Sequence, residues 1–215
     1  MSEARIDRVV TRGLVGAGRP GYPAEGVELE NNIWIVGDDE QALVIDASHD
    51  AEAIVSGVGD REALGILLTH GHEDHVNAAV EAARMLDTHV YLHPADLFLW
   101  RDTHGETLPD FELADGADFV VAGVEIAVAH TPGHTPGSVC FIAPALGTVF
   151  SGDTLFQGGP GATRWDYSSF EQIVESIRTR LFTLPEETVA RPGHGERTTV
   201  AAEMPDLDAW LARGW

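Results

Sequence analysis

A histidine-rich stretch, Thr69–His75, constrains this chain more than any other feature. It reads THGHEDH and directly follows a short apolar run. Neutral imidazoles and carboxylate oxygens are the ligands that zinc and similar first-row ions prefer. If the backbone is extended where the stretch begins, His70 and His72 point the same way and can bind one ion. Asp74 and His75 follow a turn and should face a second position, so we expect a metal site rather than a surface loop that is rich in histidine by chance.

Three later stretches carry further candidate ligands, and each follows a run with strand character. They are His130–His134, Ser151–Thr154 and Arg191–Gly195, after the runs 124–129, 148–150 and 188–190. Loops at the carboxyl ends of strands are where layered α/β enzymes build their sites. One candidate set of ligands is His70, His72 and His134. The other is Asp74, His75 and His194, and Asp153 is placed to bridge the two sets with its two oxygens.

The chain resembles the metallo-β-lactamase superfamily over nearly its whole length. The family pattern is H-x-H-x-D-H, then a histidine, a bridging aspartate and a final histidine, and all seven positions match. The resemblance implies an α/β fold of the αββα type, with two sheets face to face and helices outside. The length suits one such domain over residues 1–215. The resemblance also implies two divalent ions, for which zinc is expected first and iron or manganese also suit the ligands.

Within the superfamily, the chain looks like the glyoxalase II-like thioester hydrolases. The stretches that carry this likeness are HTPGHTPGS at 130–138, GDTLF at 152–156 and PGHG at 192–195. The likeness implies hydrolysis of a small-molecule thioester, with Asp74 as the catalytic residue that orients the attacking hydroxide and also binds metal. A thiolate leaves without much proton donation, because its conjugate acid has a pKa of about 8.5.

Other activities stay open at this point. A lactonase would use the same nucleophile. A persulfide dioxygenase resembles this fold but uses one iron, held by two histidines and an aspartate. We favour the hydrolase because GDTLF looks like the hydrolase version and every ligand of the second set is present. A class B β-lactamase is disfavoured, because those enzymes are exported and are not expected to carry the bridging Asp153.

The thiol carrier is expected to differ from glutathione. Glyoxalase II proper grips glutathione partly through basic and tyrosine residues of an added C-terminal helical region. Residues 195–215, which follow the last ligand, hold two basic residues, Arg197 and Arg213, and no tyrosine. The chain resembles actinobacterial members, whose bacteria use mycothiol, a bulkier sugar-bearing thiol. The loop at 157–167 is the candidate for substrate contact, through Arg164, Trp165 and Tyr167.

Composition excludes other partners. The formal net charge is −22, from 35 acidic and 13 basic residues. Such a chain repels phosphate backbones and anionic lipid, so we expect neither nucleic acid nor membrane as a partner. Residues 1–12 lack the apolar core of a signal peptide, and no run of about eighteen apolar residues exists, which predicts a cytoplasmic protein. Cys140, the only cysteine, lies in an apolar run and is expected to be a buried structural thiol.

The remaining pattern predicts the secondary structure in outline. Strands are expected at 8–15, 32–36, 42–45 and 89–92, with a hairpin at 119–129. Helices are expected at 50–58, 76–86, a short segment ending at Trp100, 170–181 behind a capping box at Ser168–Glu171, and 201–215. Loops are expected at 16–23 and 101–117.

Several polar residues outside the motifs keep more than one interpretation. Asp46 ends the strand at 42–45, where an aspartate in relatives supports the metal site, but it equally suits a turn or helix cap. The isolated histidines are expected to be structural, although one of them, His93, could line the cleft. The others are His49, His89 and His104.

Overall fold

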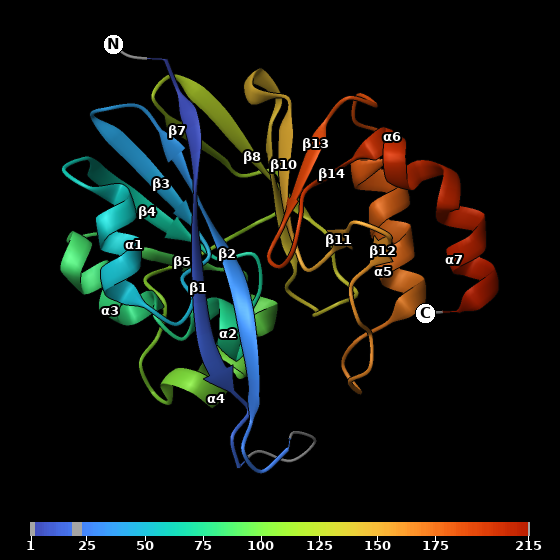
Figure 1. Ribbon diagram of the computed structural model, residues 1–215, viewed down its shortest axis with the longest axis horizontal. Helices are drawn as coiled ribbons and strands as arrows, with labels where there is room; N and C mark the ends of the chain where they lie inside the picture. The colour runs from blue at the N-terminus through green and yellow to red at the C-terminus, as the bar shows by residue number, and fades with distance from the viewer. Residues whose placement is uncertain (1–2, 19–22, 215) are drawn as a thin grey trace.

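Two six-stranded sheets lie face to face and carry helices on their outer faces (Figure 1). The computed structural model describes residues 3–18 and 23–214. The arrangement is the αββα sandwich, which confirms the expected fold class. The loop predicted at 16–23 lies partly outside the described residues.

The first sheet holds the first half of the chain. In spatial order its strands are β1 (Arg5–Val15), β2 (Val27–Gly37), β3 (Gln41–Ile45), β4 (Glu62–Leu67), β5 (Val90–Leu92) and β6 (Phe111–Glu112). The pairs β1–β2 and β2–β3 are antiparallel, and β3 through β6 are parallel. Ile45 pairs with Leu67, so the segments after β3 and β4 leave the sheet side by side.

The second sheet holds the second half of the chain. Its spatial order is β14 (Thr198–Thr199), β13 (Val189–Pro192), β10 (Thr148–Gly152), β9 (Val139–Ala143), β8 (Val124–His130) and β7 (Asp118–Val121). A separate small sheet pairs β11 (Leu155–Phe156) with β12 (Gly159–Pro160). Because β10 and β13 are parallel neighbours, the residues after them come to the same edge.

Helices cover both outer faces. They are α1 (Ala51–Val58), α2 (Glu73–Val76), α3 (Ala79–Leu86), α4 (Leu97–His104), α5 (Phe170–Ser176), α6 (Val200–Glu203) and α7 (Leu207–Arg213). Figure 1 shows α1 and α3 outside the first sheet, and α5 and α7 outside the second. None of the helices in the described residues has the length and apolar character needed to cross a membrane.

The strand β2 shows how the layers are built. Alternate side chains of a strand point to opposite faces. Ile33 and Ile35 accordingly pack in the core between the first sheet and its helices. Trp34 and Val36 pack in the core between the two sheets. All four are buried, as expected for a strand covered on both faces.

Two predicted helices are interrupted, and each break has an identifiable cause. The helix predicted at 76–86 is instead α2 and α3, because the Ala78 amide donates to Ala47 O, on the loop after β3, rather than within a helix. The helix predicted at 201–215 is α6 and α7 with a 3-10 turn at Met204–Asp206 between them. Pro205 has no amide proton to continue the helix there.

Two further predictions were wrong in detail. The segment 101–117 is not all loop, since α4 continues to His104 and Phe111 pairs with Tyr91 at the sheet edge. The cap of α5 is Ser169, whose Oγ accepts the Gln172 amide. The Ser168 hydroxyl is already engaged, because it donates to Trp165 O.

Cys140 is fully buried, in agreement with a structural thiol. Burial raises the pKa of the thiol to about 11, against the opposing effect of hydrogen bonds from threonine hydroxyls. A thiol with so high a pKa is a poor nucleophile at neutral pH.

The carboxylate of Asp96 ties two segments of the site edge together. It is completely buried at the start of α4. One oxygen, Oδ2, accepts the Gly71 amide at 2.8 Å and the Thr135 hydroxyl at 2.6 Å. The other accepts the Gly137 amide at 2.6 Å. One side chain thus joins the segment after β4 to the segment after β8.

Asp96→Ala should therefore lower the free energy of unfolding by roughly 3 kcal/mol, because it leaves the buried amides of Gly71 and Gly137 without an acceptor and removes a bond of the Thr135 hydroxyl. Urea titration of the variant and the parent protein measures this loss. Asp60→Ala, which removes an exposed carboxylate, is the matched control and should stay within about 0.5 kcal/mol. Equal losses in the two variants would contradict the role given to Asp96.

Candidate metal centre

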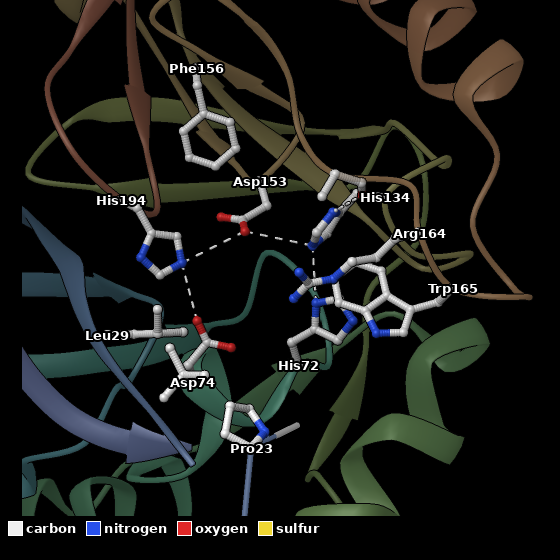
Figure 2. Close-up of a pocket in the computed structure, with 12 residues that line it drawn as sticks. Pro23, Leu29, His72, Asp74, His134, Asp153, Phe156, Arg164, Trp165 and His194 are labelled. Atoms are coloured by element: carbon white, nitrogen blue, oxygen red, sulfur yellow. Dashed lines mark hydrogen bonds and ion pairs between the residues drawn. The ribbon is translucent and has the colours of Figure 1, made fainter. Parts of the chain in front are cut away.

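Four loops bring the predicted ligands together at one edge of the two sheets. The loops follow β4, β8, β10 and β13, as the sequence predicts. They surround a cavity of about 410 Å³ (Figure 2). The residues whose ligand atoms cluster there are His70, His72, Asp74, His75, His134, Asp153 and His194.

The first set consists of three imidazole nitrogens. His72 Nδ1 lies 3.0 Å from His70 Nε2 and 2.9 Å from His134 Nε2. Ligand atoms around one tetrahedral ion, each about 2.1 Å from it, lie about 3.4 Å apart. The three nitrogens therefore have nearly the spacing that a single ion needs.

The second set consists of one carboxylate and two imidazoles. His194 Nε2 lies 3.2 Å from His75 Nε2 and 3.1 Å from Asp74 Oδ2. His75 Nε2 and Asp74 Oδ2 are 3.4 Å apart. His72 still has an extended backbone, whereas Asp74 and His75 lie on α2, which is the turn that the sequence predicts.

Asp153 lies between the two sets. Its Oδ2 is 3.6 Å from His134 Nε2, in the first set, and 3.7 Å from His194 Nε2, in the second. Figure 2 shows the carboxylate between these two rings. This is the position that a bridging ligand requires, and metal binding by the seven residues stays a prediction.

Backbone carbonyls fix the tautomers of two rings. His134 Nδ1 donates to Ala162 O at 2.8 Å, and His194 Nδ1 donates to Glu30 O at 2.7 Å. A carbonyl oxygen can only accept, so Nδ1 carries the proton in both neutral rings. Each Nε2 therefore directs a lone pair into the cluster.

Asp46 fixes two more rings, so it supports the site as well as ending a strand. Its Oδ2 accepts from His75 Nδ1 at 2.9 Å, and its two oxygens accept the Thr69 hydroxyl at 3.0 and 2.9 Å. Because the Thr69 proton is engaged there, the Thr69 oxygen accepts from His70 Nδ1 at 3.1 Å. Both histidines thus present Nε2 to the cluster, the arrangement typical of metal-ligating histidines.

His72 has the opposite orientation and presents Nδ1. Its Nε2 lies 2.9 Å from the Tyr167 hydroxyl, and its ring packs 4.5 Å from that of Trp165. The loop expected to contact substrate therefore also holds one of the candidate ligands. That second role of Tyr167 was missed from the sequence.

Electrostatics differ between the two sets. In the first set, burial lowers the pKa of His70 and His72 well below 6.5, and neighbouring imidazoles add to the effect. In the second set, burial opposes the charge on His75, but nearby carboxylates outweigh it and raise the pKa of His75 to about 10. These carboxylates are Asp153, Asp74 and Asp46. The second set therefore needs a positive charge beside its carboxylates, whereas the first offers neutral nitrogen lone pairs.

The residues present fit two divalent cations. Asp153 Oδ1 is buried with no hydrogen-bond partner among the described residues. This oxygen lies 3.4 Å from His75 Nε2. A buried carboxylate oxygen without a hydrogen bond is costly, and a cation beside it would offset that cost. A Cβ at Gly193 would lie 2.6 Å from this oxygen and 2.4 Å from His75 Cε1, so glycine keeps the space open. Five imidazoles and two carboxylates suit first-row ions.

Asn31 and His49 also belong to the surroundings of the cluster, and sequence reasoning missed both. Asn31 Nδ2 lies 3.1 Å from Asp74 Oδ2. His49, expected to be structural, has its Nε2 2.9 Å from Asn31 Oδ1. Neither residue lies in a histidine-rich motif, so no spacing marks them.

The other histidines outside the motifs are not cluster members. His93 stacks on His130 at 4.3 Å and its Nδ1 accepts the Ala95 amide. His104 Nε2 donates to Val76 O.

Gly193→Ala is expected to weaken Zn²⁺ binding without removing a ligand atom, because the new methyl group would overlap the Asp153 oxygen and the His75 ring. Chelator competition measures the affinity. Gly195→Ala is the matched control, since a Cβ there meets nothing within 4 Å and adds only the strain of a positive φ. Unchanged affinity in Gly193→Ala would show that this space is not needed.

Comparison with known proteins agrees with the fold. The model of the metallo-beta-lactamase superfamily matches residues 26–194. Hydroxyacylglutathione hydrolase GloC of Haemophilus influenzae is 32% identical over 191 residues, which cover 81% of this chain and 90% of that protein.

Solved structures give the same result. TTHA1623 in a di-iron-bound form is similar with a TM-score of 0.72 and 36% identity, over 82% of this chain and 93% of that one. The B3 metallo-beta-lactamase BLEG-1 has a TM-score of 0.75 and 27% identity, over 92% and 97% of the two chains. The chain therefore belongs to the metallo-β-lactamase superfamily.

Proposed function

We propose that the protein is a binuclear hydrolase that cleaves a small-molecule thioester. The observation that carries the proposal is the position of Asp153 between two complete sets of three ligand atoms. Zinc is the expected ion, and the di-iron form of the similar TTHA1623 supports iron as an alternative. The similarity to a hydroxyacylglutathione hydrolase supports a thioester as the substrate.

When bound, two divalent ions supply an activated water molecule and positive charge for a developing oxyanion. Asp74 lines the cavity, and its Oδ2 is the carboxylate oxygen of the second set, 3.1 Å from His194 Nε2. We assign to Asp74 the orientation of the attacking water toward the substrate carbonyl. A thiolate leaving group then departs without a general acid, because its conjugate acid has a pKa of about 8.5.

The cavity has two different walls. One is apolar and is lined by Val27, Leu29 and Phe156. The other is formed by Arg164 and Trp165, and the Arg164 guanidinium lies 4.8 Å from the Trp165 ring centroid. The apolar wall suits an acyl chain, and the second wall suits a polar part of the carrier.

The carrier is proposed to be a sugar-bearing thiol such as mycothiol. Arg164 is the one basic side chain among the described residues that line the cavity. Glutathione is negatively charged overall, so a chain with a formal net charge of −22 should attract it weakly. Trp165, which lines the cavity, offers an aromatic ring against which a sugar ring can pack.

The direct test compares kcat/KM for one acyl group carried on mycothiol and on glutathione. We expect both thioesters to be hydrolysed and the mycothiol ester to be the faster. A persulfide, a lactone and a β-lactam are assayed beside them with the same metal-loaded protein. A clear preference for glutathione would contradict the carrier, and absence of thioester hydrolysis would contradict the reaction.

The second candidate is a persulfide dioxygenase, which uses one iron. One grouping in the structure favours it: His70, His75 and Asp153 also offer ligand atoms within 4.8 Å of one another. Two histidines and one carboxylate are the set that such iron enzymes use. Oxygen consumption with the persulfide separates this reaction from hydrolysis.

Asp74→Asn is expected to lower turnover of the thioester by orders of magnitude, because it removes the negative charge from both the second set and the attacking water. The nitrogens of His70, His72 and His134 are untouched, so one ion should still bind. Asp87→Asn, at the left-handed cap of α3 where asparagine fits, is the control. Activity of Asp74→Asn within tenfold of the parent would overturn the assigned role.

A further inference from the structure

A chain of side-chain hydrogen bonds runs from the backbone of the loop after β3 to the second ligand set. It passes from Asn77 through His49 to Asn31 and ends at Asp74. We propose that His49 is a positioning residue, which holds the Asn31 amide so that its N–H group faces Asp74 and fixes the affinity of the second set for its ion. This inference rests on the binuclear site proposed above.

One backbone donor fixes the direction of every hydrogen bond in this series. The His49 amide donates to Asn77 Oδ1 at 2.6 Å, so the other atom of that side chain, Nδ2, is a donor. It faces His49 Nδ1 at 3.0 Å, which must then accept. The proton of the neutral His49 ring therefore lies on Nε2, from which it is donated to Asn31 Oδ1 at 2.9 Å.

The end of the chain lies among the second set of ligands. With Oδ1 held by His49, Asn31 can only present Nδ2 to the cluster. This nitrogen is 3.1 Å from Asp74 Oδ2 and 3.4 Å from both His75 Nε2 and His194 Nε2. A rotated amide would place its oxygen against the Asp74 carboxylate, where two acceptors repel each other.

The neighbouring strand β1 leaves room for the His49 ring. A Cβ at Gly13, on β1, would lie 2.3 Å from His49 Nδ1, so the strand leaves this space for the ring. His49 itself has a φ of 62°, a left-handed conformation that is uncommon for non-glycine residues, although asparagine, aspartate and histidine adopt it more often than others. The backbone is held in this conformation while the ring reaches Asn31, which is completely buried.

Loss of the His49 contact should therefore act on one set of ligands only. An Asn31 amide that is free to rotate no longer holds Asp74 Oδ2 in place for the second ion. The first set has its own supports in Ala162 O and Tyr167, which this chain of bonds does not touch. Mutation of a residue that orients a metal ligand typically lowers the metal affinity by about 10- to 100-fold.

Two substitutions of His49 separate its hydrogen bond from its packing. His49→Asn suits the left-handed backbone and keeps a polar group near Asn77, but its shorter side chain cannot reach Asn31. His49→Gln is longer and places an amide donor near the position of Nε2. The metal-free proteins are titrated with Zn²⁺ alone in competition with a chromophoric chelator. For each protein, this titration gives the affinities for the first and for the second Zn²⁺. Thermal unfolding in EDTA checks that each variant folds.

We expect His49→Asn to weaken the second Zn²⁺ by about tenfold or more and leave the first unchanged, and His49→Gln to stay within about threefold of the parent. If His49→Asn bound its second Zn²⁺ as tightly as the parent does, this inference would be overturned and the binuclear site would stand. The inference would also be overturned if His49→Gln bound its second Zn²⁺ as weakly as His49→Asn, because the hydrogen bond to Asn31 would then not be the cause of the loss of affinity. A parent protein that binds only one Zn²⁺ would overturn the binuclear site and this inference with it.

Discussion

Two carboxylates that are nearly shielded from water, Asp74 and Asp153, set the constraint on which the rest of the site depends. Their side chains are 13% and 11% exposed, and one oxygen of Asp153 has no hydrogen-bond partner in the described residues. Charges in such surroundings need opposite charges close by. Protonated imidazoles can supply some of that charge, as the raised pKa of His75 indicates. Divalent cations between the two sets would supply it more completely.

The two sheets meet this constraint through the order of their strands. Because β3 and β4 are parallel neighbours, Asp46 and the histidine-rich stretch leave the first sheet together. The parallel pair β10 and β13 likewise delivers Asp153 and His194 from the second sheet. The sheets are joined at this edge, where the Asn32 amide donates to Gly193 O at 2.7 Å. Ligands from both halves of the chain are therefore fixed relative to one another by backbone structure.

The fold was predicted through the family resemblance that the motifs carry, and the seven candidate ligands were predicted because each lies in a strongly patterned stretch. Strand ends followed by histidine, aspartate and glycine are visible without coordinates, so the four ligand-bearing loops could be named from the sequence. The supporting residues were harder to find. Asn31 lies within an ordinary strand, and Asp96 resembles a helix cap in sequence. Their roles depend on contacts 43 and 41 residues away in the chain, with Asp74 and Gly137. The break between α2 and α3 was missed for the same reason, because the Ala78 amide is taken by a distant loop.

The central claim is that Asp153 joins two ions, and X-ray diffraction at the zinc absorption edge tests it most directly. Crystals of the protein loaded with Zn²⁺ should show two anomalous peaks about 3.5–4 Å apart. The Asp153 carboxylate should lie about 2.0–2.2 Å from each peak. A single peak, or an Asp153 carboxylate more than about 3 Å from either ion, would contradict the account.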